Sequence, residues 1–231
     1  MKERPILFSG AMVRAVLSGA KTQTRRLLRW RPREEGINLQ FSGLSLGCYN
    51  CDDPASGYVL RSRGAGSCWN DRTWPAHCPY GAPGDRLWVR EAFAYSVKDP
   101  DSFHEPGEYS AETHDIVCRA TSDNTGEWEH YEDGNRTRCA PPWRPGIHMP
   151  RWASRITLEI TEVRVQRLQE IGGYDVLAEG VDNGKSNPTM GVRWQNMQRT
   201  AFEELWNSIN GKRAPWSSNP WVWAVSFRRL P

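Results

Sequence analysis

Two long stretches without periodic apolar residues limit where this chain can build a hydrophobic core. Residues 29–82 and 94–147 are rich in Gly, Pro, Ser and charged side chains, and they account for almost half of the 231 residues. Only 38% of all residues are hydrophobic, so the core has to come from the segments around these stretches. We therefore expect a single domain over residues 1–231, with long loop insertions at about 29–82 and 94–147.

Five segments outside the insertions are predicted to be β-strands. They are residues 5–8, 22–28, 87–92, 156–165 and 221–227. In the last three, apolar side chains recur at every second position, as expected when one face of a strand is buried. The alternation changes phase between Ile160 and Val163, which is typical of a bend or bulge at the corner of a small barrel.

Three segments are predicted to be helices. Ser9 is a favourable N-cap for a helix over residues 11–18, which Gly19 ends. Residues 175–180 form a short helix, and residues 194–210 form the longest one. The predicted buried face of the longest helix carries Trp194, Met197, Ala201, Leu205 and Ile209. Short strands with a few helices favour an α+β fold, a small mixed β-barrel with peripheral helices.

The turn after the first helix places four reactive or cationic side chains close together. Lys21, Thr24, Arg25 and Arg26 lie within six residues. An amine beside a hydroxyl can activate a nucleophile, and arginines can hold an anionic or planar substrate. The same residues are also typical of an exposed edge strand whose arginines pair with acidic side chains. The residues alone leave both interpretations open.

Five short blocks of sequence resemble the ASCH domain of the PUA-like superfamily, whose members are small β-barrels linked to RNA metabolism. The blocks are SGAKTQTRR at 18–26, PGDRLWV at 83–89, ITLEIT at 156–161, DVLAEG at 175–180 and WVWAVSF at 221–227. They follow one another in the family's order, and most of both insertions falls outside them. The chain looks most similar to the larger phage and prophage proteins of the family. The resemblance implies a PUA-like β-barrel.

Some small bacterial members of this family are amidohydrolases that act on N(4)-acetylcytidine. Their functional residues are a Lys and a Thr in a Gly-x-Lys-Thr-x-Thr motif, and a Glu in the short helix after the central strands. By that resemblance Lys21, Thr24 and Glu179 are the catalytic residues of this chain. Amide hydrolysis needs a nucleophile, a base and a proton donor for the leaving amine. Thr24 fits the nucleophile, Lys21 the base, and Glu179 the group that transfers a proton or positions water.

Four further side chains are expected to bind the substrate. Arg25 and Arg26 follow Thr24 directly and depart from the family pattern. Glu91 ends a predicted strand and is a rival carboxylate for the catalytic role. Arg155 comes just before the central strand. Because the insertions can reshape or cover the pocket, the substrate can differ from that of the small family members.

The segment before the central strand combines arginine with tryptophan. Residues 150–155 contain Arg151, Trp152 and Arg155. One interpretation is a contact surface for single-stranded nucleic acid, with Arg on phosphate and Trp on base. The other is a structural loop at the end of the barrel, in which Arg151 or Arg155 pairs with an acid.

The expected function is recognition of RNA or a modified nucleoside, with hydrolysis of an N-acyl group on a pyrimidine nucleoside as the chemistry. The alternative is a non-catalytic reader of RNA or modified nucleic acid that uses the same pocket. A nuclease is less well supported, since the sequence has no convincing cluster of metal-binding carboxylates. The expected partners are therefore a modified nucleoside or single-stranded RNA, and the hydrolysis requires no cofactor.

Four of the six cysteines lie in the first insertion. Cys48, Cys51, Cys68 and Cys78 fall within 31 residues that have few apolar side chains to form a core. They could hold a structural zinc ion, although the second half is not a Cys-x-x-Cys pair. The alternative is that all four are reduced thiols, and the spacing does not decide between these two possibilities.

Composition sets the expected location and gives a weak indication of partners. The sequence has no apolar run of membrane-spanning length and no signal-peptide segment, so we expect a cytoplasmic protein with reduced cysteines. The net charge of +3 is only mildly basic, and it is compatible with a local basic surface. Several of the 12 Trp lie in Gly- and Pro-rich segments, where they either pin loops to the core or stack on bases.

Overall fold

The computed structural model describes most of the chain and confirms a mixed α+β fold. The described residues are 1–39, 43–50, 53–64, 66, 68–97, 110–112, 114–122, 128–132, 135–139, 143–181 and 191–231. They divide into two compact units. Unit 1 holds residues 1–22, 84–159 and 227–231, and unit 2 holds residues 23–83 and 160–226.

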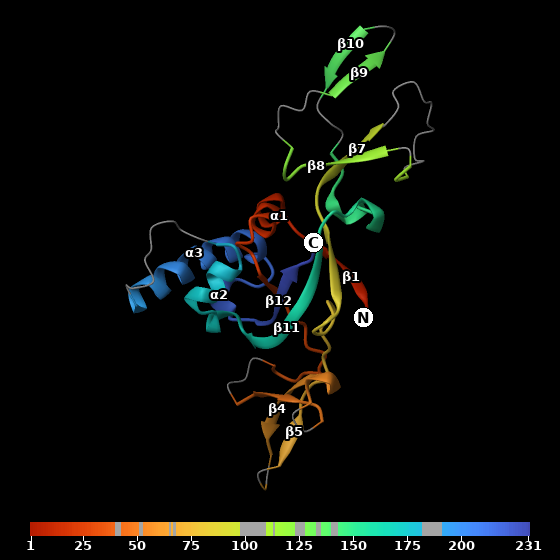
Figure 1. Ribbon diagram of the computed structural model, residues 1–231. Coiled ribbons are helices and arrows are strands. Elements are labelled where there is room, and N and C mark those ends of the chain that lie inside the picture. The colour runs from red at the N-terminus through yellow and green to blue at the C-terminus, as the bar shows by residue number, and fades with distance from the viewer. Residues whose placement is uncertain are drawn as a thin grey trace. The chain divides into compact units, whose positions relative to one another are not determined.

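The largest sheet has five strands, which correspond to the five predicted from the sequence (Figure 1). In order across the sheet they are β1 (Glu3–Leu7), β6 (Arg86–Arg90), β11 (Thr157–Arg167), β12 (Trp221–Arg229) and β2 (Gln23–Leu27). β1 runs parallel to β6, whereas β6 is antiparallel to β11 and β12 is antiparallel to β2. β2 comes last in this order, so one of its edges has no neighbouring strand among those described.

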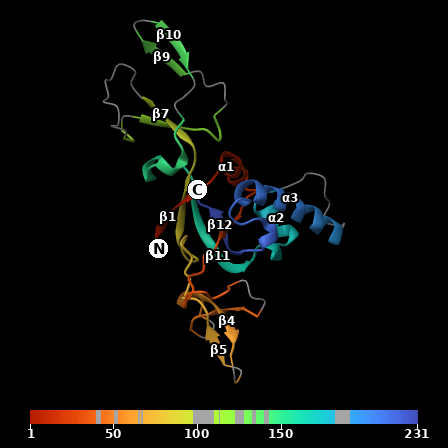
Figure 2. The ribbon, with the colours of Figure 1, turned by 180° about the vertical axis from the view of Figure 1, so that it is seen from behind.

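Unit 1 contains one α-helix and two further strand pairs. In α1 (Gly10–Leu17) the Ser9 hydroxyl accepts a hydrogen bond from the Met12 N–H at 3.4 Å, which confirms the predicted N-cap. The strand pairs are antiparallel: β7 (Phe93–Val97) with β8 (His114–Cys118), and β9 (Trp128–Glu132) with β10 (Asn135–Cys139) (Figure 2). A small core of Phe93, Cys118, Met149 and Ala153 lies under the first pair.

Unit 2 builds its main core from two α-helices, α2 (Gly173–Ala178) and α3 (Val192–Asn210), and from strand β12. The buried core residues are Leu168, Ile171, Val176, Phe202, Trp206, Trp216 and Val222. The predicted face of α3 is confirmed at Trp194 and is one position off beyond it, because Gln198, Phe202 and Trp206 are the other buried residues of this helix. The large rings of Phe202 and Trp206 bury more apolar area than Ala201 and Leu205 would.

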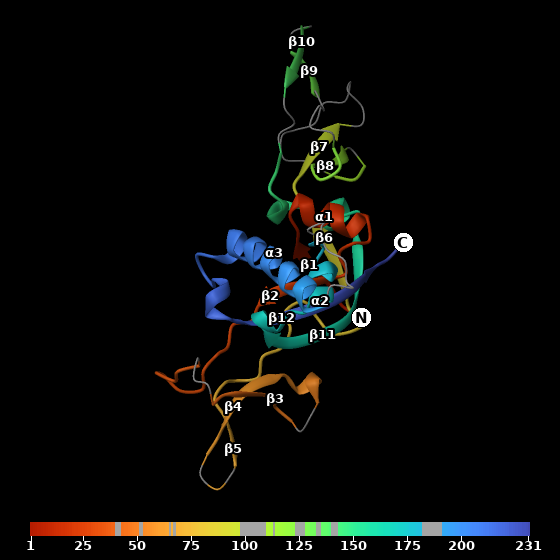
Figure 3. The same ribbon diagram turned by 90° about the vertical axis from the view of Figure 1, so that its left-hand side faces the viewer.

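The two insertions contain strands, and the prediction of long loops is therefore corrected. The first insertion folds in part into an antiparallel three-stranded sheet of β3 (Ser45–Cys48), β4 (Tyr58–Arg63) and β5 (Trp69–Asp71) (Figure 3). The second insertion contains most of β7 and all of β8, β9 and β10. These strands lack the simple alternation that marks a strand in a sequence. In β4, for example, the adjacent residues Val59 and Leu60 are both fully buried.

Short helical turns and the four sheets complete the described structure. The 3-10 helices are Pro54–Ser56, Gly146–His148, Arg151–Ala153, Leu168–Glu170 and Trp216–Ser218. The described strands form four separate sheets and no closed barrel. A helix needs about 20 apolar residues to cross a bilayer, and none of the helices in the described part of the chain meets that requirement.

Candidate functional site

Predicted site residues make up most of the polar side chains that the fold buries. Nine polar or charged residues are buried in the described part of the chain, and five of them were candidates from the sequence. The five are Lys21, Thr24, Arg25, Glu91 and Glu179. Burying a polar or charged group costs free energy unless it gains partners, so each of these positions needs a structural or functional explanation.

Strand β2 presents its polar residues on two opposite faces. Successive side chains of a strand alternate between faces, and residues paired across strands share a face. Thr24 and Arg26 therefore lie on the same face as Trp223, the partner of Arg26 in β12. Gln23 and Arg25 lie on the other face, against the helices. One face of β2 thus carries the Thr24 hydroxyl and the Arg26 guanidinium, and the other carries Arg25 and its ion pairs.

Arg25 is at the centre of a buried polar network that joins β2 to α2. Its side chain is fully buried, and its Nη1 donates to Glu179 Oε1 at 3.2 Å and to Gln23 Oε1 at 2.6 Å. Its Nη2 donates to Asp175 Oδ2 at 2.9 Å. Arg164 Nη2 reaches the other oxygen of Asp175 at 3.3 Å. Two acids and two guanidinium groups therefore neutralise one another next to the site.

The network keeps Asp175 ionised. Burial opposes ionisation of this carboxyl, but the guanidinium groups of Arg25 and Arg164 more than offset that effect. The backbone N–H of Gly172 also donates to it, at 3.5 Å. The pKa of Asp175 is consequently held below its usual value.

Glu179 lies within electrostatic reach of both arginines. It is the C-cap residue of α2 and is largely buried. Burial lowers the pKa of Arg26, while Tyr80, whose ring centroid is 6.0 Å from this guanidinium, and Glu179 act in the opposite direction. Arg25 is in direct contact with Glu179, whereas the charge of Glu179 acts on Arg26 by raising its pKa.

Lys21 is buried in unit 1, two residues before β2 begins. Only 2% of the residue is exposed, and its Nζ lies 5.8 Å from the centroid of the Phe8 ring. That ring packs against Phe227, with 6.1 Å between the ring centroids. The backbone N–H of Lys21 donates to Ala15 O at 2.9 Å, which holds the turn after α1. An aromatic face attracts a nearby cation, so the amine is held in a defined place.

Glu91 and Arg155 were both predicted to bind substrate, and the structure pairs them with each other in unit 1. Arg155 Nε and Nη2 donate to the two carboxylate oxygens of Glu91 at 3.0 and 3.1 Å. The Glu91 side chain is 1% exposed, whereas that of Arg155 is 36% exposed. This two-bond geometry is the strongest that an arginine and a carboxylate form. The pair gives both residues a structural role, and their part in substrate binding stays a prediction.

This ion pair is expected to be asymmetric in its effect on stability. Arg155→Ala leaves a buried carboxylate without its guanidinium, and we expect a loss of about 3 kcal/mol of unfolding free energy. Glu91→Gln leaves a guanidinium that water can still reach, and we expect a loss of about 1 kcal/mol. Urea unfolding followed by tryptophan fluorescence measures both. Equal losses would mean that burial of the carboxylate does not dominate the energetics of the pair.

The segment at residues 150–155 follows the structural interpretation for its arginines. Arg151 Nε donates to Glu3 Oε2 at 3.0 Å, and Arg155 is paired as described above. Trp152 is 40% exposed and stacks on Tyr95, with 6.0 Å between ring centroids. Because acids already neutralise both arginines, this segment is a weaker candidate for phosphate contacts than its sequence suggests.

Cys118 is a buried thiol beside the Glu91–Arg155 pair. Burial, reinforced by the Glu91 carboxylate and opposed by Arg155, raises the pKa of Cys118 to about 12. At about pH 8 the reactive thiolate is then on the order of one in ten thousand molecules. We expect iodoacetamide to label the exposed Cys68 in the folded protein but Cys118 only after denaturation. Peptide mapping tests this, and rapid labelling of native Cys118 would contradict it.

Two of the four cysteines that were candidates for zinc lie near the same side chain, Tyr58, and a third lies elsewhere. Cys48 is paired with Tyr58 across β3 and β4, and both Cys48 and Cys78 act on the Tyr58 hydroxyl. Together with burial, the larger effect, they raise the pKa of Tyr58. Cys68 lies at the opposite end of β4, and Cys51 falls outside the described residues. No group of three metal-binding side chains occurs among the described residues, so the zinc site stays a prediction.

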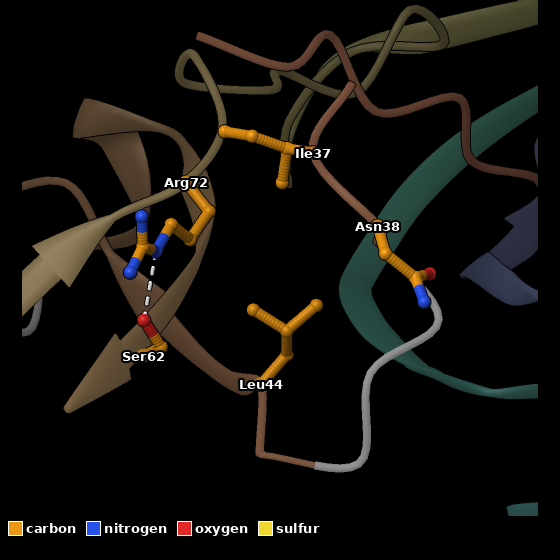
Figure 4. Close-up of a pocket in the computed structure, with 5 residues that line it drawn as sticks. All are labelled: Ile37, Asn38, Leu44, Ser62 and Arg72. Atoms are coloured by element: carbon orange, nitrogen blue, oxygen red, sulfur yellow. Dashed lines mark hydrogen bonds between the residues drawn. The ribbon is translucent and has the colours of Figure 1, made fainter. Parts of the chain in front are cut away.

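A cavity lies in the first insertion, away from every predicted site residue of unit 2. It has a volume of about 320 Å³ and is lined by Ile37, Asn38, Leu44, Ser62 and Arg72. Figure 4 shows Ile37 and Leu44 pointing toward one another across it. Arg72 Nε donates to Ser62 Oγ at 2.8 Å on one side. This cavity is at the small end of the range for ligand pockets.

Sequence reasoning missed three residues that the site contains in unit 2. Asp175, Arg164 and Tyr80 contact or influence the arginines of β2. One signal was present: Asp175 and Glu179 are four residues apart, so a helix places them on the same side. The contributions of Arg164 and Tyr80 depend on tertiary packing and have no comparable signal.

Comparisons with known proteins return no match: no family model, curated protein or solved structure matches the chain. The side chains themselves must therefore indicate the chemistry of the site. In unit 2 the hydroxyl of Thr24 and the guanidinium of Arg26 share one face of β2, and the charge of Glu179 acts on Arg26. Such a set can bind a planar, polar group through hydrogen bonds and charge.

Proposed function

We propose that this chain is an ASCH-type, PUA-like domain that binds a modified pyrimidine nucleoside in the cytoplasm and hydrolyses an N-acyl group on its base. The observation that carries this proposal is the burial of Lys21, Thr24 and Glu179, the three residues that the resemblance to N(4)-acetylcytidine amidohydrolases implies. The strand order β1-β6-β11-β12-β2 supplies the strands from which a small barrel of this type is built.

The proposed reaction proceeds through an acyl-threonine intermediate. The Thr24 hydroxyl attacks the acyl carbonyl carbon while the neutral amine of Lys21 accepts the hydroxyl proton. The chain keeps this amine within three residues of the hydroxyl. The proton that Lys21 accepted then passes through the Glu179 carboxylate to the exocyclic nitrogen of the base. The bond between this nitrogen and the acyl carbon breaks, so the base leaves with a free amino group and the acyl group stays on Thr24. Water then hydrolyses the threonine ester, which releases the carboxylic acid and regenerates the hydroxyl.

The two arginines of β2 have different roles in this proposal. Arg26 shares a face with Thr24, so its guanidinium orients the planar base. Arg25 holds Glu179 in place from the helix side through the 3.2 Å contact. Arg26 is therefore a substrate-binding residue, and Arg25 is a positioning residue.

A panel of nucleosides tests the proposed activity. Purified protein is incubated with N-acylated and N-methylated cytidines and adenosines, and mass spectrometry follows the release of the unmodified nucleoside. We expect turnover of an acylated pyrimidine and none of a methylated one, because the mechanism attacks a carbonyl carbon. Absence of turnover across all acylated nucleosides would contradict the hydrolase proposal.

A non-catalytic reader is the second candidate, and one observation favours it. Arg25 already occupies one oxygen of Glu179, which suits a carboxylate with a structural task better than one that transfers protons. A reader binds acetylated RNA without releasing acetate. If the wild type binds such RNA, releases nothing, and loses affinity on Lys21→Ala, the reader is the function.

A further inference from the structure

We infer that the outer face of the β3–β4–β5 sheet binds single-stranded nucleic acid. This Arg/aromatic face consists of Arg33, Arg61 and Arg63 together with Tyr49, Trp69 and Trp74. It is a separate surface from the proposed nucleoside site, and the inference does not depend on hydrolysis.

The register of the sheet determines which residues share this face. Ser62 pairs with Asn70, and Arg61 and Arg63 pair with Asp71 and Trp69. Tyr58 lies on the same face as Ser62 and packs against Trp223 of β12, with 5.6 Å between ring centroids. That face is therefore turned toward β12, and Arg61, Arg63, Trp69 and Asp71 lie on the opposite face.

Arg33 joins two of the exposed aromatic rings. Its guanidinium carbon lies 5.6 Å from the centroid of Tyr49 and 5.0 Å from that of Trp74. Its Nε donates to Thr73 O at 3.1 Å, and its Nη2 lies 3.6 Å from Asp71 Oδ2. The backbone and carboxylate contacts fix the guanidinium against both rings, so the cluster is pre-organised.

The same face continues along β4. Arg61 Nε lies 3.3 Å from Asp71 Oδ1, which links it to the Arg33 cluster. The Arg61 guanidinium lies over Gly47. A Cβ added to this glycine would lie 2.7 Å from the guanidinium, so only glycine leaves enough space for the Arg61 side chain. Two residues further on, the Arg63 guanidinium lies 5.2 Å from the Trp69 ring centroid. Arg61 Nη2 also donates to the Cys48 carbonyl oxygen, so Arg61 orders the face, and Arg33 and Arg63 with their three rings are the groups that contact a ligand in this proposal.

Exposure and charge indicate the chemistry of the partner. Tyr49, Trp69 and Trp74 are 43%, 46% and 47% exposed, so each ring keeps accessible surface beside its arginine. Asp71 is the carboxylate that pairs with these arginines among the described residues, which leaves the face positive. Exposed rings interleaved with cations are what single-stranded nucleic acid requires, because bases stack on rings and phosphates bind guanidinium groups. An acidic peptide would use the charges but not the rings.

Trp74 belongs to the face through its contact with Arg33, because the register changes between the Arg61–Asp71 and Tyr58–Ala76 pairs and a bulge follows β5. Stacking on such rings tolerates any base, so we expect little sequence preference.

Fluorescence anisotropy with a labelled RNA of about 12 uridines tests the inference, using the full chain. We expect Trp69→Ala to weaken binding about ten-fold or more through the lost stacking. Arg63→Ala should lower the slope of log affinity against log salt by about 0.7. The matched control is Trp152→Ala, which removes a similarly exposed tryptophan in unit 1 and should leave affinity unchanged. Thermal melting confirms that the variants fold.

Each outcome decides the question. Unchanged affinity in both Trp69→Ala and Arg63→Ala overturns the inference, as does an equal loss in Trp152→Ala. Equally tight binding of a labelled poly-glutamate peptide, insensitive to Trp69→Ala, assigns the face to acidic proteins instead. Nucleoside turnover is measured on the same variants and should stay at the wild-type level. If the wild type binds RNA through this face but hydrolyses no nucleoside, the hydrolase proposal is contradicted and the inference about this face is supported.

Discussion

Arg25→Ala is expected to lower the free energy of unfolding by about 3–5 kcal/mol. The substitution removes the guanidinium that two carboxylates share, while burial of Glu179 continues to penalise its charge. Urea unfolding followed by tryptophan fluorescence is a suitable measurement, since Trp206 and Trp216 lie in the same core as α2. Arg228→Ala is the matched control. Arg228 pairs with Glu159 at 2.8 Å but is 66% exposed, so its loss should cost less than about 1 kcal/mol.

The effect of Arg25→Ala should also depend on pH. The pKa of Asp175 is depressed in the folded protein, so this carboxylate stabilises the fold above its unfolded pKa. That contribution is lost as pH falls through the folded pKa. Without Arg25 the pKa of Asp175 rises, and protonation relieves the burial penalty of this carboxyl. The gap between wild type and variant should therefore be largest near about pH 7 and shrink toward about pH 3. If wild type and Arg25→Ala differ equally in unfolding free energy at both pH values, lost packing is the cause of the destabilisation.

Alternation and capping predicted the central strands and the first helix, because both depend on short-range sequence. β6 shows this most clearly, since Leu87 and Val89 are buried and the residues beside them in Arg86–Arg90 are only partly buried. The strands of the insertions were not predicted, because their burial does not follow a short-range pattern in the sequence. These strands are covered by arginine side chains lying over rings and glycine, as Arg61 lies over Gly47. The stems of long cationic side chains add to the few buried apolar residues of the β3–β4–β5 sheet, such as Val59 and Leu60, and hydropathy scores these stems as polar.

The candidate site was only partly accessible from the sequence. Residue types in a short motif indicated Lys21, Thr24 and Arg25, and all three are buried. The partners of these residues depend on tertiary structure. Arg25 meets Glu179 because α2 packs on the outer strand of the sheet, 154 positions later in the chain. No local pattern encodes that contact, and so the sequence left open whether the arginines bind a substrate or pair with acids.

Lys21→Ala, Thr24→Ala and Glu179→Ala are each expected to reduce turnover of an acylated pyrimidine nucleoside by about 100-fold or more. The three groups act as a unit, so combining two substitutions should add little further loss. Without the amine the hydroxyl stays protonated and weakly nucleophilic. Without the carboxylate, proton transfer to the leaving amine slows. Steady-state kinetics with mass-spectrometric detection, alongside thermal melting to verify folding, measures these losses.

Conservative variants distinguish chemistry from structure at the same positions. Thr24→Ser keeps a hydroxyl and should retain much of the activity that Thr24→Ala loses. Glu179→Gln keeps a hydrogen-bond acceptor for Arg25 but cannot transfer a proton, so it should preserve stability and lose turnover. Arg26→Ala should raise KM more than it lowers kcat, because a guanidinium on the face of Thr24 orients the base and performs no proton transfer. Full activity of Glu179→Gln would mean that the carboxylate is only a structural partner of Arg25. In that case Thr24 and Lys21 would have to supply the proton for the leaving amine themselves.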